Sequence, residues 1–354
     1  MTDLDEIAQR FRATAADSKS RAPLYAKLAG RIADDPATSR LLFHAPAEQR
    51  LPVLLFACVH WLLLHDPDDA LAAHYPNLTP DADPDPDLDG AYPAFRAFCE
   101  RHEPRLAGLL ATRSTQTNEV GRCATLLPVL GRVSEEVGPL ALVDVGASGG
   151  LNLLFDRYEY HYEPGGRVGG PSPVVLPCGT RGDVPVPRAF PAVGARIGLD
   201  RSPIDLTDPD AARWLEACVW PDQADRFHRL HAAIGLAQLD PPRVRAGDAV
   251  GDLGATIALV DGGGHPVVVN SWVLNYLSEG QRRAYVAELE RIGAGRDLSW
   301  VYAEMPALVS GVPVPDDPER VHRTVVTLVR WRGGTRTVEH LAETHPHGFW
   351  IHWR

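Results

Sequence analysis

The chain has 354 residues, of which 45% are apolar and 23% are charged, and its formal net charge at pH 7 is -11. These fractions are ordinary for a globular protein, and the length allows two domains. The acidic balance argues against a general nucleic-acid-binding protein, which carries a basic patch, and the acidic N-terminus lacks the basic and apolar regions of a signal peptide.

The chain contains five cysteines, with no Cys-x-x-Cys pair among them. An odd count and scattered positions argue against a disulfide framework and a zinc site, and favour a reducing compartment. The most apolar segment, Leu51–Leu64, is interrupted by His60 and is too short to span a bilayer. We therefore expect a cytoplasmic protein without a membrane partner.

Apolar residues recur at helical spacing through the first 78 residues, which predicts a helical bundle with Leu51–Leu64 as its central helix. The following stretch, Thr79–Gly90, alternates aspartate with proline. It lacks the ligand order and the closing glutamate of a calcium-binding EF-hand, so we predict a solvated loop. The clearest helical series are Ile7, Phe11 and Ala15, then Leu24, Leu28 and Ile32.

Helical spacing resumes at Phe95 and continues to Val133. Pro128 falls inside this pattern. Because proline has no backbone N–H to donate and its ring crowds the preceding turn, we expect a kink or a restart of the helix there.

A polar run, Thr115–Arg122, interrupts this helical region. One interpretation is a capped helix start, with Thr117 or Asn118 as the cap. The other is that Asn118, Glu119 and Arg122 line a site immediately before the glycine-rich stretch that follows. Both interpretations remain open on the residues alone.

From Leu140 onward, predicted strands alternate with predicted helices, which indicates a mostly parallel sheet with helices on both faces. One helix is predicted from Ser278, a good N-cap residue, to Ile292. Near the end, Arg332-Gly333-Gly334 is a hairpin turn signal, so antiparallel strands close the sheet. The predicted strands are Ala141–Val145, Val193–Leu199, Pro242–Asp248, Pro266–Ser271, Leu298–Ala303, Arg323–Trp331, Thr335–Leu341 and Gly348–Trp353.

These elements predict a Rossmann-like α/β domain at residues 126–354, preceded by a helical domain at residues 1–125. The stretch Tyr158–Ala192 is rich in Gly and Pro and separates the first two strand–helix units. We predict that it is an insertion, a small hairpin or a flap.

The stretch Asp144–Asn152 predicts a buried strand, a tight glycine loop and a helix start. Such a loop lets a ligand approach the backbone, and free N–H groups at a helix start favour anions. The dinucleotide fingerprint is not met because Ser148 occupies its middle glycine position, and no phosphate-binding Gly-Lys-Ser/Thr loop occurs.

Three acids lie at the carboxyl ends of the first three predicted parallel strands: Asp144, Asp200 and Asp248. In a doubly wound sheet, ligands bind at the carboxyl ends of the strands. An acid after the second strand can accept hydrogen bonds from ribose hydroxyls, and an acid after the third can accept one from the amine of adenine. Together they favour a nucleoside ligand.

The pattern D-x-G-x-S-x-G at Asp144, Gly146, Ser148 and Gly150 resembles motif I of the class I S-adenosylmethionine-dependent methyltransferases. The resemblance covers about Leu140–Arg354. It implies S-adenosylmethionine as cofactor, held by the loop and by the acids after the second and third strands, with substrate or catalytic groups after the fourth strand. With Asn118 and Arg122 of the polar run added, the candidate cofactor-binding residues are Asn118, Arg122, Asp144, Gly146, Ala147, Ser148, Gly150, Asn152, Asp200, Asp248, Ala249 and Asn270.

A second resemblance covers nearly the whole chain. The strings Thr115–Arg122, Val145–Leu153, Gly198–Asp200, Pro203–Asp208 and Val219–Gln223 are similar to those of an uncharacterised bacterial family, domain of unknown function 2332. This resemblance implies no reaction. It favours the interpretation of the Asn118–Arg122 run as part of a site.

Methyl transfer relies mostly on proximity, and a base is needed only if the acceptor loses a proton. Glu119, Asn270 and Tyr276 are the candidate catalytic residues. Arg122 and Arg157 are candidates to pair with a carboxylate of the cofactor or substrate. The helical domain and the insertion would enclose a small-molecule acceptor. No metal is expected, because the C-terminal histidines have no zinc-ligand spacing.

Two alternatives remain. Gly146–Gly150 also satisfies G-x-S-x-G, the nucleophile elbow of α/β-hydrolases, with Ser148 as nucleophile. The acid would be Asp261 or Asp297, and the histidine one of His340, His345, His347 and His352. The third possibility is a protein that binds S-adenosylmethionine without transferring its methyl group, because fold does not imply function.

Overall fold

The computed structural model describes residues 2–79, 88–313 and 323–354. Most of the acidic loop predicted at Thr79–Gly90 therefore lies outside the described residues. The chain forms two compact units. The helical unit comprises residues 1–117 and 207–231, and the sheet unit comprises residues 118–206 and 232–354.

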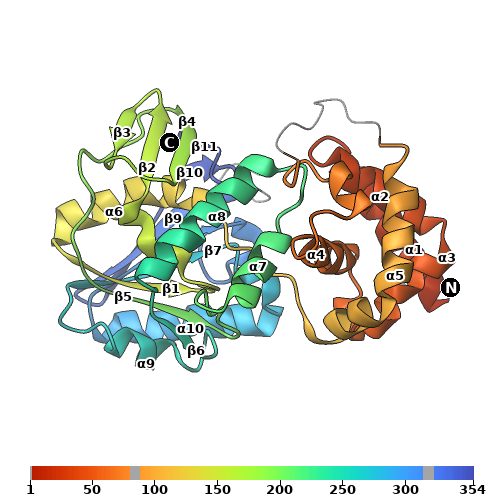
Figure 1. Cartoon of the computed structure of the whole chain (residues 1–354). Helices are drawn as coiled ribbons and strands as arrows, with labels where there is room; N and C mark the ends of the chain where they lie inside the picture. Colours follow the sequence, from red (N-terminus) through yellow and green to blue (C-terminus); the bar gives the residue numbers. More distant parts are fainter. Residues whose placement is uncertain (1, 80–87, 314–322) are drawn as a thin grey trace. The chain divides into compact units, whose positions relative to one another are not determined.

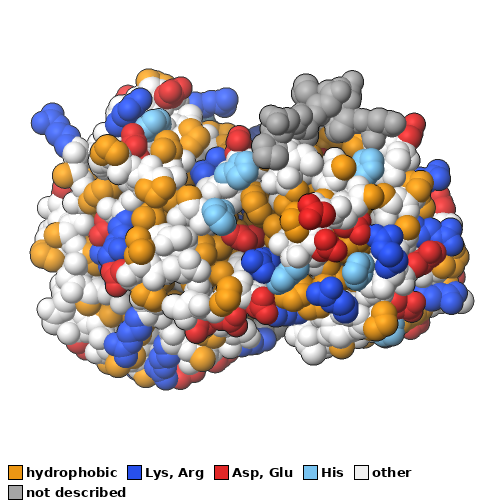
Figure 2. All heavy atoms as spheres, in the orientation of Figure 1, with side chains coloured by type: hydrophobic (Ala, Val, Ile, Leu, Met, Phe, Trp, Pro, Cys, Tyr) orange, Lys and Arg blue, Asp and Glu red, His pale blue; other side chains and the backbone are white. Residues whose placement is uncertain are grey.

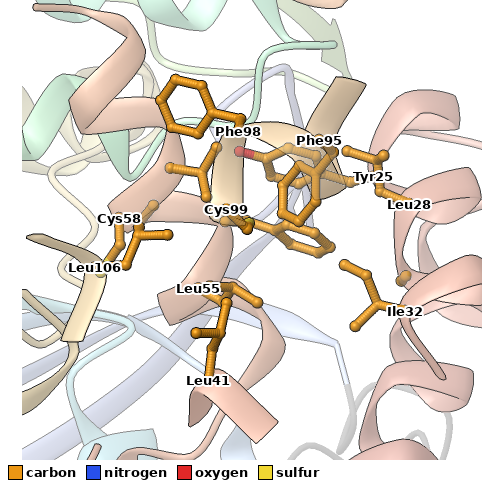
Figure 3. Close-up of a cluster of buried hydrophobic side chains, with 14 of the residues drawn as sticks. Tyr25, Leu28, Ile32, Leu41, Leu55, Cys58, Phe95, Phe98, Cys99 and Leu106 are labelled. Atoms are coloured by element: carbon orange, nitrogen blue, oxygen red, sulfur yellow. The ribbon is translucent and has the colours of Figure 1, made fainter. Parts of the chain in front are cut away.

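The helical unit is built around α4, which is buried on nearly all sides and confirms the predicted central helix. Its core combines side chains from α2, α4, α5 and the 3-10 helix η1, with Phe95, Phe98 and Tyr25 among the largest (Figure 3). The segment 207–231 contributes Trp214 to the same core. The helices are α1 (Asp3–Ser18), α2 (Pro23–Ala33), α3 (Pro36–Ser39), η1 (Arg40–His44), η2 (Ala47–Gln49), α4 (Pro52–Leu63), η3 (Ala70–His74), α5 (Ala91–Thr112), α7 (Pro209–Ala217) and the first half of α8 (Ala224–Leu239).

The sheet unit contains one sheet of 11 described strands in the order β3-β2-β4-β11-β10-β9-β8-β7-β1-β5-β6. Helices α9 and α10 pack on one face, and α6 lies on the other (Figure 1). The strands are β1 (Leu140–Val145), β2 (Glu159–Glu163), β3 (Gly166–Val168), β4 (Val175–Arg181), β5 (Val193–Asp200), β6 (Val244–Ala246), β7 (His265–Ser271), β8 (Leu298–Glu304), β9 (Thr324–Arg332), β10 (Thr335–Thr344) and β11 (Trp350–Trp353). The helices are η4 (Val120–Arg122), α6 (Cys123–Val137), η5 (Leu151–Arg157), α9 (Leu253–Ala258), η6 (Leu274–Tyr276), α10 (Glu279–Gly295) and η7 (Pro306–Leu308).

Five neighbouring strands, β6-β5-β1-β7-β8, are all parallel. In chain order they follow the 3-2-1-4-5 arrangement of doubly wound folds. The order reverses between β1 and β7, where Val145 lies beside Asn270. Ligands of such folds bind at the carboxyl ends of the strands beside this switch point, so the glycine loop after β1 has the position expected for a binding loop.

The predicted strands of the parallel sheet are confirmed, as is the helix that begins after Ser278. Ser278 and Gln281 form a capping box at the start of α10. The C-terminal hairpin also forms, with Gly333 and Gly334 at positive φ between β9 and β10. The sequence pattern was sufficient here because β1 and β8 are buried along their whole length and the hairpin turn carries two glycines.

The predicted insertion does not form a flap. Its strands β2, β3 and β4 extend the main sheet, because β4 pairs in parallel with β11 and β2 pairs in parallel with β4. Only β2 and β3 form the expected hairpin. Tyr158, Tyr160 and Tyr162 are buried, so this segment adds core rather than a mobile cover.

The helix predicted after the glycine loop is instead the seven-residue 3-10 helix η5, which has non-helical dihedrals at Leu154. Two hydroxyl groups from the insertion satisfy its carbonyls: Tyr158 donates to the oxygen of Leu151 at 2.6 Å, and Tyr160 to that of Phe155 at 2.7 Å. Side-chain donors thus replace the backbone ladder that an α-helix would supply.

Pro128 does not restart the helix, since α6 runs continuously from Cys123 to Val137. A proline at this position leaves the carbonyl of Ala124 without its backbone donor. The hydroxyl of Tyr162 donates to that oxygen at 2.8 Å. The insertion therefore compensates for the missing N–H, which explains why the helix continues.

None of the described helices is both long enough and apolar enough to cross a membrane. On the face drawn in Figure 2, acidic and basic described side chains are interspersed rather than gathered into one patch of a single charge.

Candidate functional site

The glycine loop at the end of β1 is held in a tight, left-handed conformation. Gly146, Ser148 and Gly150 have φ values of 76°, 53° and 75°. A Cβ atom on Gly146 would lie 2.4 Å from Cγ2 of Val273, and one on Gly150 would lie 2.8 Å from Pro242 and Val244. Glycine is thus required both by the dihedrals and by the close packing of neighbouring segments.

Asp200, at the end of β5, fastens this loop. Its Oδ2 accepts the backbone N–H of Ser148 at 2.8 Å, and its Oδ1 accepts that of Ser202 at 2.8 Å. Each carboxylate oxygen can accept a further hydrogen bond. Asp200 therefore shapes the loop and retains capacity for a ligand hydroxyl.

Asp144 is buried, with 7% of its surface exposed, and its Oδ2 has no hydrogen-bond partner. Burial raises the pKa of its carboxyl group to about 7, the Asp200 carboxylate contributes in the same direction, and Arg122 lowers it. An ionised carboxylate in such a position is costly unless a donor or cation reaches it. Asp144 is therefore a candidate contact for a positively charged or proton-donating ligand group.

A narrow pocket opens beside Asp144, on the α6 face of the sheet. Its empty space, including solvent at its mouth, is about 340 Å³. Asp144 and Asn152 are the polar residues of its wall, and Cys123 contacts Asn152, with 3.4 Å between Sγ and Oδ1. The other lining residues are Leu126, Leu130, Leu142, Leu153, Phe155 and Val269.

Arg122 joins three segments at this edge of the sheet. Its side chain is buried, its Nε donates to the carbonyl of Pro346 at 2.9 Å, and one terminal nitrogen donates to the carbonyl of Ser271 at 3.0 Å. Burial raises the pKa values of Asp144 and Glu304, and the positive charge of Arg122 opposes that rise. The guanidinium is the principal buried cation described near these acids.

The polar run before α6 lies against the glycine loop. This is the position expected if its residues line a site. The amide nitrogen of Asn118 is 3.5 Å from the carbonyl of Ala147. The helix cap is Glu119 rather than Thr117 or Asn118: its Oε1 accepts the N–H of Gly121 at 3.1 Å. Its Oε2 is 3.1 Å from Nδ1 of His347.

Glu304, at the end of β8, is a site residue that sequence reasoning missed. It is fully buried, and burial raises its pKa to about 7. Its Oε1 accepts from the side chain of Asn270 at 2.8 Å and from the backbone N–H of Val273 at 2.7 Å. The available signal was an acid that ends an otherwise apolar strand.

Asn270 contributes to this network instead of facing a ligand. Its Oδ1 accepts from Trp300 at 2.6 Å and from Tyr285 at 3.2 Å, while its amide nitrogen donates to Glu304. Its side chain is fully buried. Asn270 therefore holds Glu304, and the predicted roles as catalytic and cofactor-contacting residue are not supported by its placement.

Four other predicted residues lie outside this cluster. The Oδ1 of Asp248 accepts two backbone N–H groups of its own loop, from Val250 and Gly251, which lowers its pKa. Tyr276 is 72% exposed. Arg157 forms a surface ion pair with Asp240. Ala249, beside Asp248, packs instead against the core on the α10 face.

The C-terminal histidines pack with aromatic rings. The ring centroids of His345 and Phe349 are 4.6 Å apart, and those of His345 and His347 are 5.5 Å apart. Within the described ranges, no group of three His, Cys, Asp or Glu side chains is placed to hold a metal ion.

Searches with the sequence and the structure found no match among curated proteins and none among solved structures. Residues 8–353 match the model of a family described as "Uncharacterized protein conserved in bacteria (DUF2332)". The matched range includes the glycine loop, the polar run before α6 and the acids described above. The chain therefore belongs to this bacterial family.

Proposed function

We propose that the sheet unit binds S-adenosylmethionine at the carboxyl ends of β1 and β7 and transfers its methyl group to a small molecule. The observation that carries the proposal is the buried carboxyl group of Asp144, with one unpartnered oxygen, directly beneath a glycine loop at the switch point. A ligand with positive charge would offset the cost of burying this group. S-adenosylmethionine carries an ammonium and a sulfonium.

The other described groups have supporting roles. Asp200 keeps the N–H of Ser148 oriented and retains acceptor capacity for ribose hydroxyls. Arg122 donates to Ser271 at the carboxyl end of β7 and to Pro346 in the turn after β10, and so links these two segments. These contacts pre-organise the loop, which reduces the entropy lost when a ligand binds.

The cofactor would supply an activated methyl group, so the protein's main contribution is orientation of the acceptor. Where the acceptor must lose a proton, a base with a pKa near the working pH is the most effective. Asp144 has a pKa of about 7 in the free protein, but the positive charge that the proposal places beside it would lower this value, so Asp144 is assigned to cofactor binding and not to proton transfer. Of the three predicted catalytic residues, Glu119 is engaged as a helix cap, Asn270 is not a base and Tyr276 is 72% exposed.

Isothermal titration calorimetry with S-adenosylmethionine and S-adenosylhomocysteine tests the proposal. We expect binding of both, weakened at least tenfold by Asp144→Asn for the methylated, positively charged cofactor. Asp261→Asn is the matched control, because Asp261 loses the same charge but forms an ion pair with Arg296 at the opposite edge of the sheet. Folded protein that binds neither compound removes the methyltransferase proposal.

One observation favours the hydrolase alternative: Ser148 is a non-glycine residue with positive φ, as in a strained nucleophile turn. Its predicted acids are wrongly placed, however. Asp261 precedes β7 and Asp297 precedes β8, so both lie at the amino-terminal edge of the parallel strands. Strands of six residues span about 20 Å, which separates these acids from the serine.

The non-catalytic alternative differs from the main proposal only in the fate of the methyl group. Incubation of the protein with radiolabelled S-adenosylmethionine and a bacterial small-molecule extract discriminates the two. Protein-dependent transfer of label to a new small molecule supports the enzyme, whereas tight binding with complete retention of label supports a binding protein.

A further inference from the structure

We propose that Glu304 is a positioning residue for this site, which holds the segment after β7 against the glycine loop. The segment concerned, residues 272–274, is called the β7 loop below. The inference about the loop stands on the free protein, and only its effect on ligand affinity rests on the function proposed above.

The carboxylate of Glu304 accepts hydrogen bonds from the β7 loop. The Oε1 of Glu304 accepts the backbone N–H groups of Val273 at 2.7 Å and Leu274 at 3.4 Å, together with the amide of Asn270 at 2.8 Å. Glu304 is fully buried, so these donors replace water. A buried acceptor that serves two consecutive backbone donors fixes the position of their peptide groups.

These hydrogen bonds maintain a strained backbone conformation at Trp272. Trp272 has φ 57°, a left-handed conformation that is unfavourable for a residue with a side chain. Its N–H donates to the carbonyl of Ala303 at 3.1 Å, and its indole donates to Thr324 at 3.1 Å. The strained turn is therefore held from β8, β9 and the carboxylate together.

The β7 loop packs against the glycine loop through Val273. The position of a Cβ on Gly146 lies 2.4 Å from Cγ2 of Val273, so the Val273 side chain occupies the space that only a glycine leaves free. The N–H of the same Val273 is held by Glu304. Displacement of Val273 would remove the packing partner of the glycine loop, so Glu304 controls that loop without touching a ligand.

Asp144 and Glu304 have different roles because they lie on opposite faces of the sheet. Asp144 faces the pocket beside α6, whereas Asn270, the partner of Glu304, bonds to Tyr285 of α10. Side chains alternate between faces along a strand, and the register places Asp144 beside Val269 rather than Asn270. The two carboxyl groups therefore do not form an acid pair.

Hydrogen–deuterium exchange on the unliganded full chain tests the inference. In Glu304→Ala, we expect amides in 272–274 to exchange at least tenfold faster, and the calorimetric Kd for S-adenosylmethionine to rise at least fivefold. Glu304→Gln keeps an acceptor oxygen of the same reach, so it should restore most of the protection. If the alanine variant does not fold, Glu304→Asp, one methylene shorter, is expected to loosen the same amides.

Glu216→Ala is the control, because Glu216 is also buried but lies in the helical unit, where it pairs with His231. It should lower the melting temperature without changing exchange in 272–274 or the Kd. Unchanged exchange in folded Glu304→Ala, or in folded Glu304→Asp where the alanine variant does not fold, would overturn the positioning role. Faster local exchange with no binding by the parent protein would support Glu304's role while refuting the proposed function.

Discussion

The backbone N–H of Ser148 donates to the carboxylate of Asp200 at 2.8 Å, which ties the glycine loop to the next parallel strand. Asp200→Ala should remove this acceptor, lower the free energy of unfolding by about 1–3 kcal/mol and weaken cofactor binding. Urea unfolding and calorimetry measure the two effects. Asp200→Asn retains one oxygen acceptor, so its stability and its cofactor affinity should lie between those of the parent protein and the alanine variant. Unchanged binding in the alanine variant would refute the role assigned to Asp200.

The pKa of Asp144 predicts how stability changes with pH. Burial raises that pKa to about 7, and Asp200 and Arg122 are the charged groups that act on it. An unfolded aspartate titrates near about 3.9. Between these values the folded state keeps a proton that the unfolded state releases, so the free energy of unfolding falls as the pH rises from about 4 to about 7.

Asp144→Asn removes the titrating group, and with it this fall in the free energy of unfolding. We expect the variant to match the parent protein near pH 4 and to exceed its stability above pH 7, by up to about 4 kcal/mol. Urea unfolding across this range measures the difference. A smaller slope should remain, because burial also raises the pKa of Glu304 to about 7. Parallel stability curves for the two proteins would contradict the prediction.

Gly146→Ala tests the contact between the glycine loop and Val273. The positive φ alone costs about 1–2 kcal/mol, and the overlap with Val273 adds about 1–3 kcal/mol. Gly333→Ala is the control, because Gly333 also has positive φ but nothing within 4 Å of its Cβ position. Val273→Ala in the Gly146 variant should recover only the overlap, measured as a double-mutant cycle. Equal costs at both glycines would show that the contact is unimportant.

Labelling with a fluorophosphonate tests the hydrolase alternative. We expect no adduct at Ser148, because the predicted acids lie at the other edge of the sheet. Mass spectrometry of the intact protein measures the adduct, with Ser148→Ala as the control. Stoichiometric labelling that the alanine substitution abolishes would establish Ser148 as a nucleophile and displace the methyltransferase proposal.

Strands β1, β7 and β8 could be predicted because each is a short, mostly apolar run, and α10 could be predicted because Ser278 and Gln281 form a local cap. The carboxyl ends of those strands then identified Asp144 and Asp200. These features depend on residues that are neighbours in the sequence, and the position of the two acids follows from the general rule for ligand sites in doubly wound sheets.

Other features depend on partners that are distant in the chain. The inclusion of 207–231 in the helical unit depends on the packing of Trp214 with residues of the N-terminal helices. The continuity of α6 through Pro128 depends on Tyr162. In the sequence, Glu304 is an acid at the end of an apolar strand, which does not distinguish it from other acids. Its role depends on Val273, which only the fold brings into contact with it.

The pairing of β4 with β11 makes one part of the sheet depend on the last residues of the chain. Gly179 of β4 pairs with Trp350 of β11. Strand β4 can therefore complete its hydrogen-bond ladder only after β11 has been synthesised. Contacts so far apart in sequence form late, because closure of the intervening chain must precede them. During translation the β2–β4 segment would therefore leave the ribosome with an open edge, and its pairing with the sheet would wait for β11.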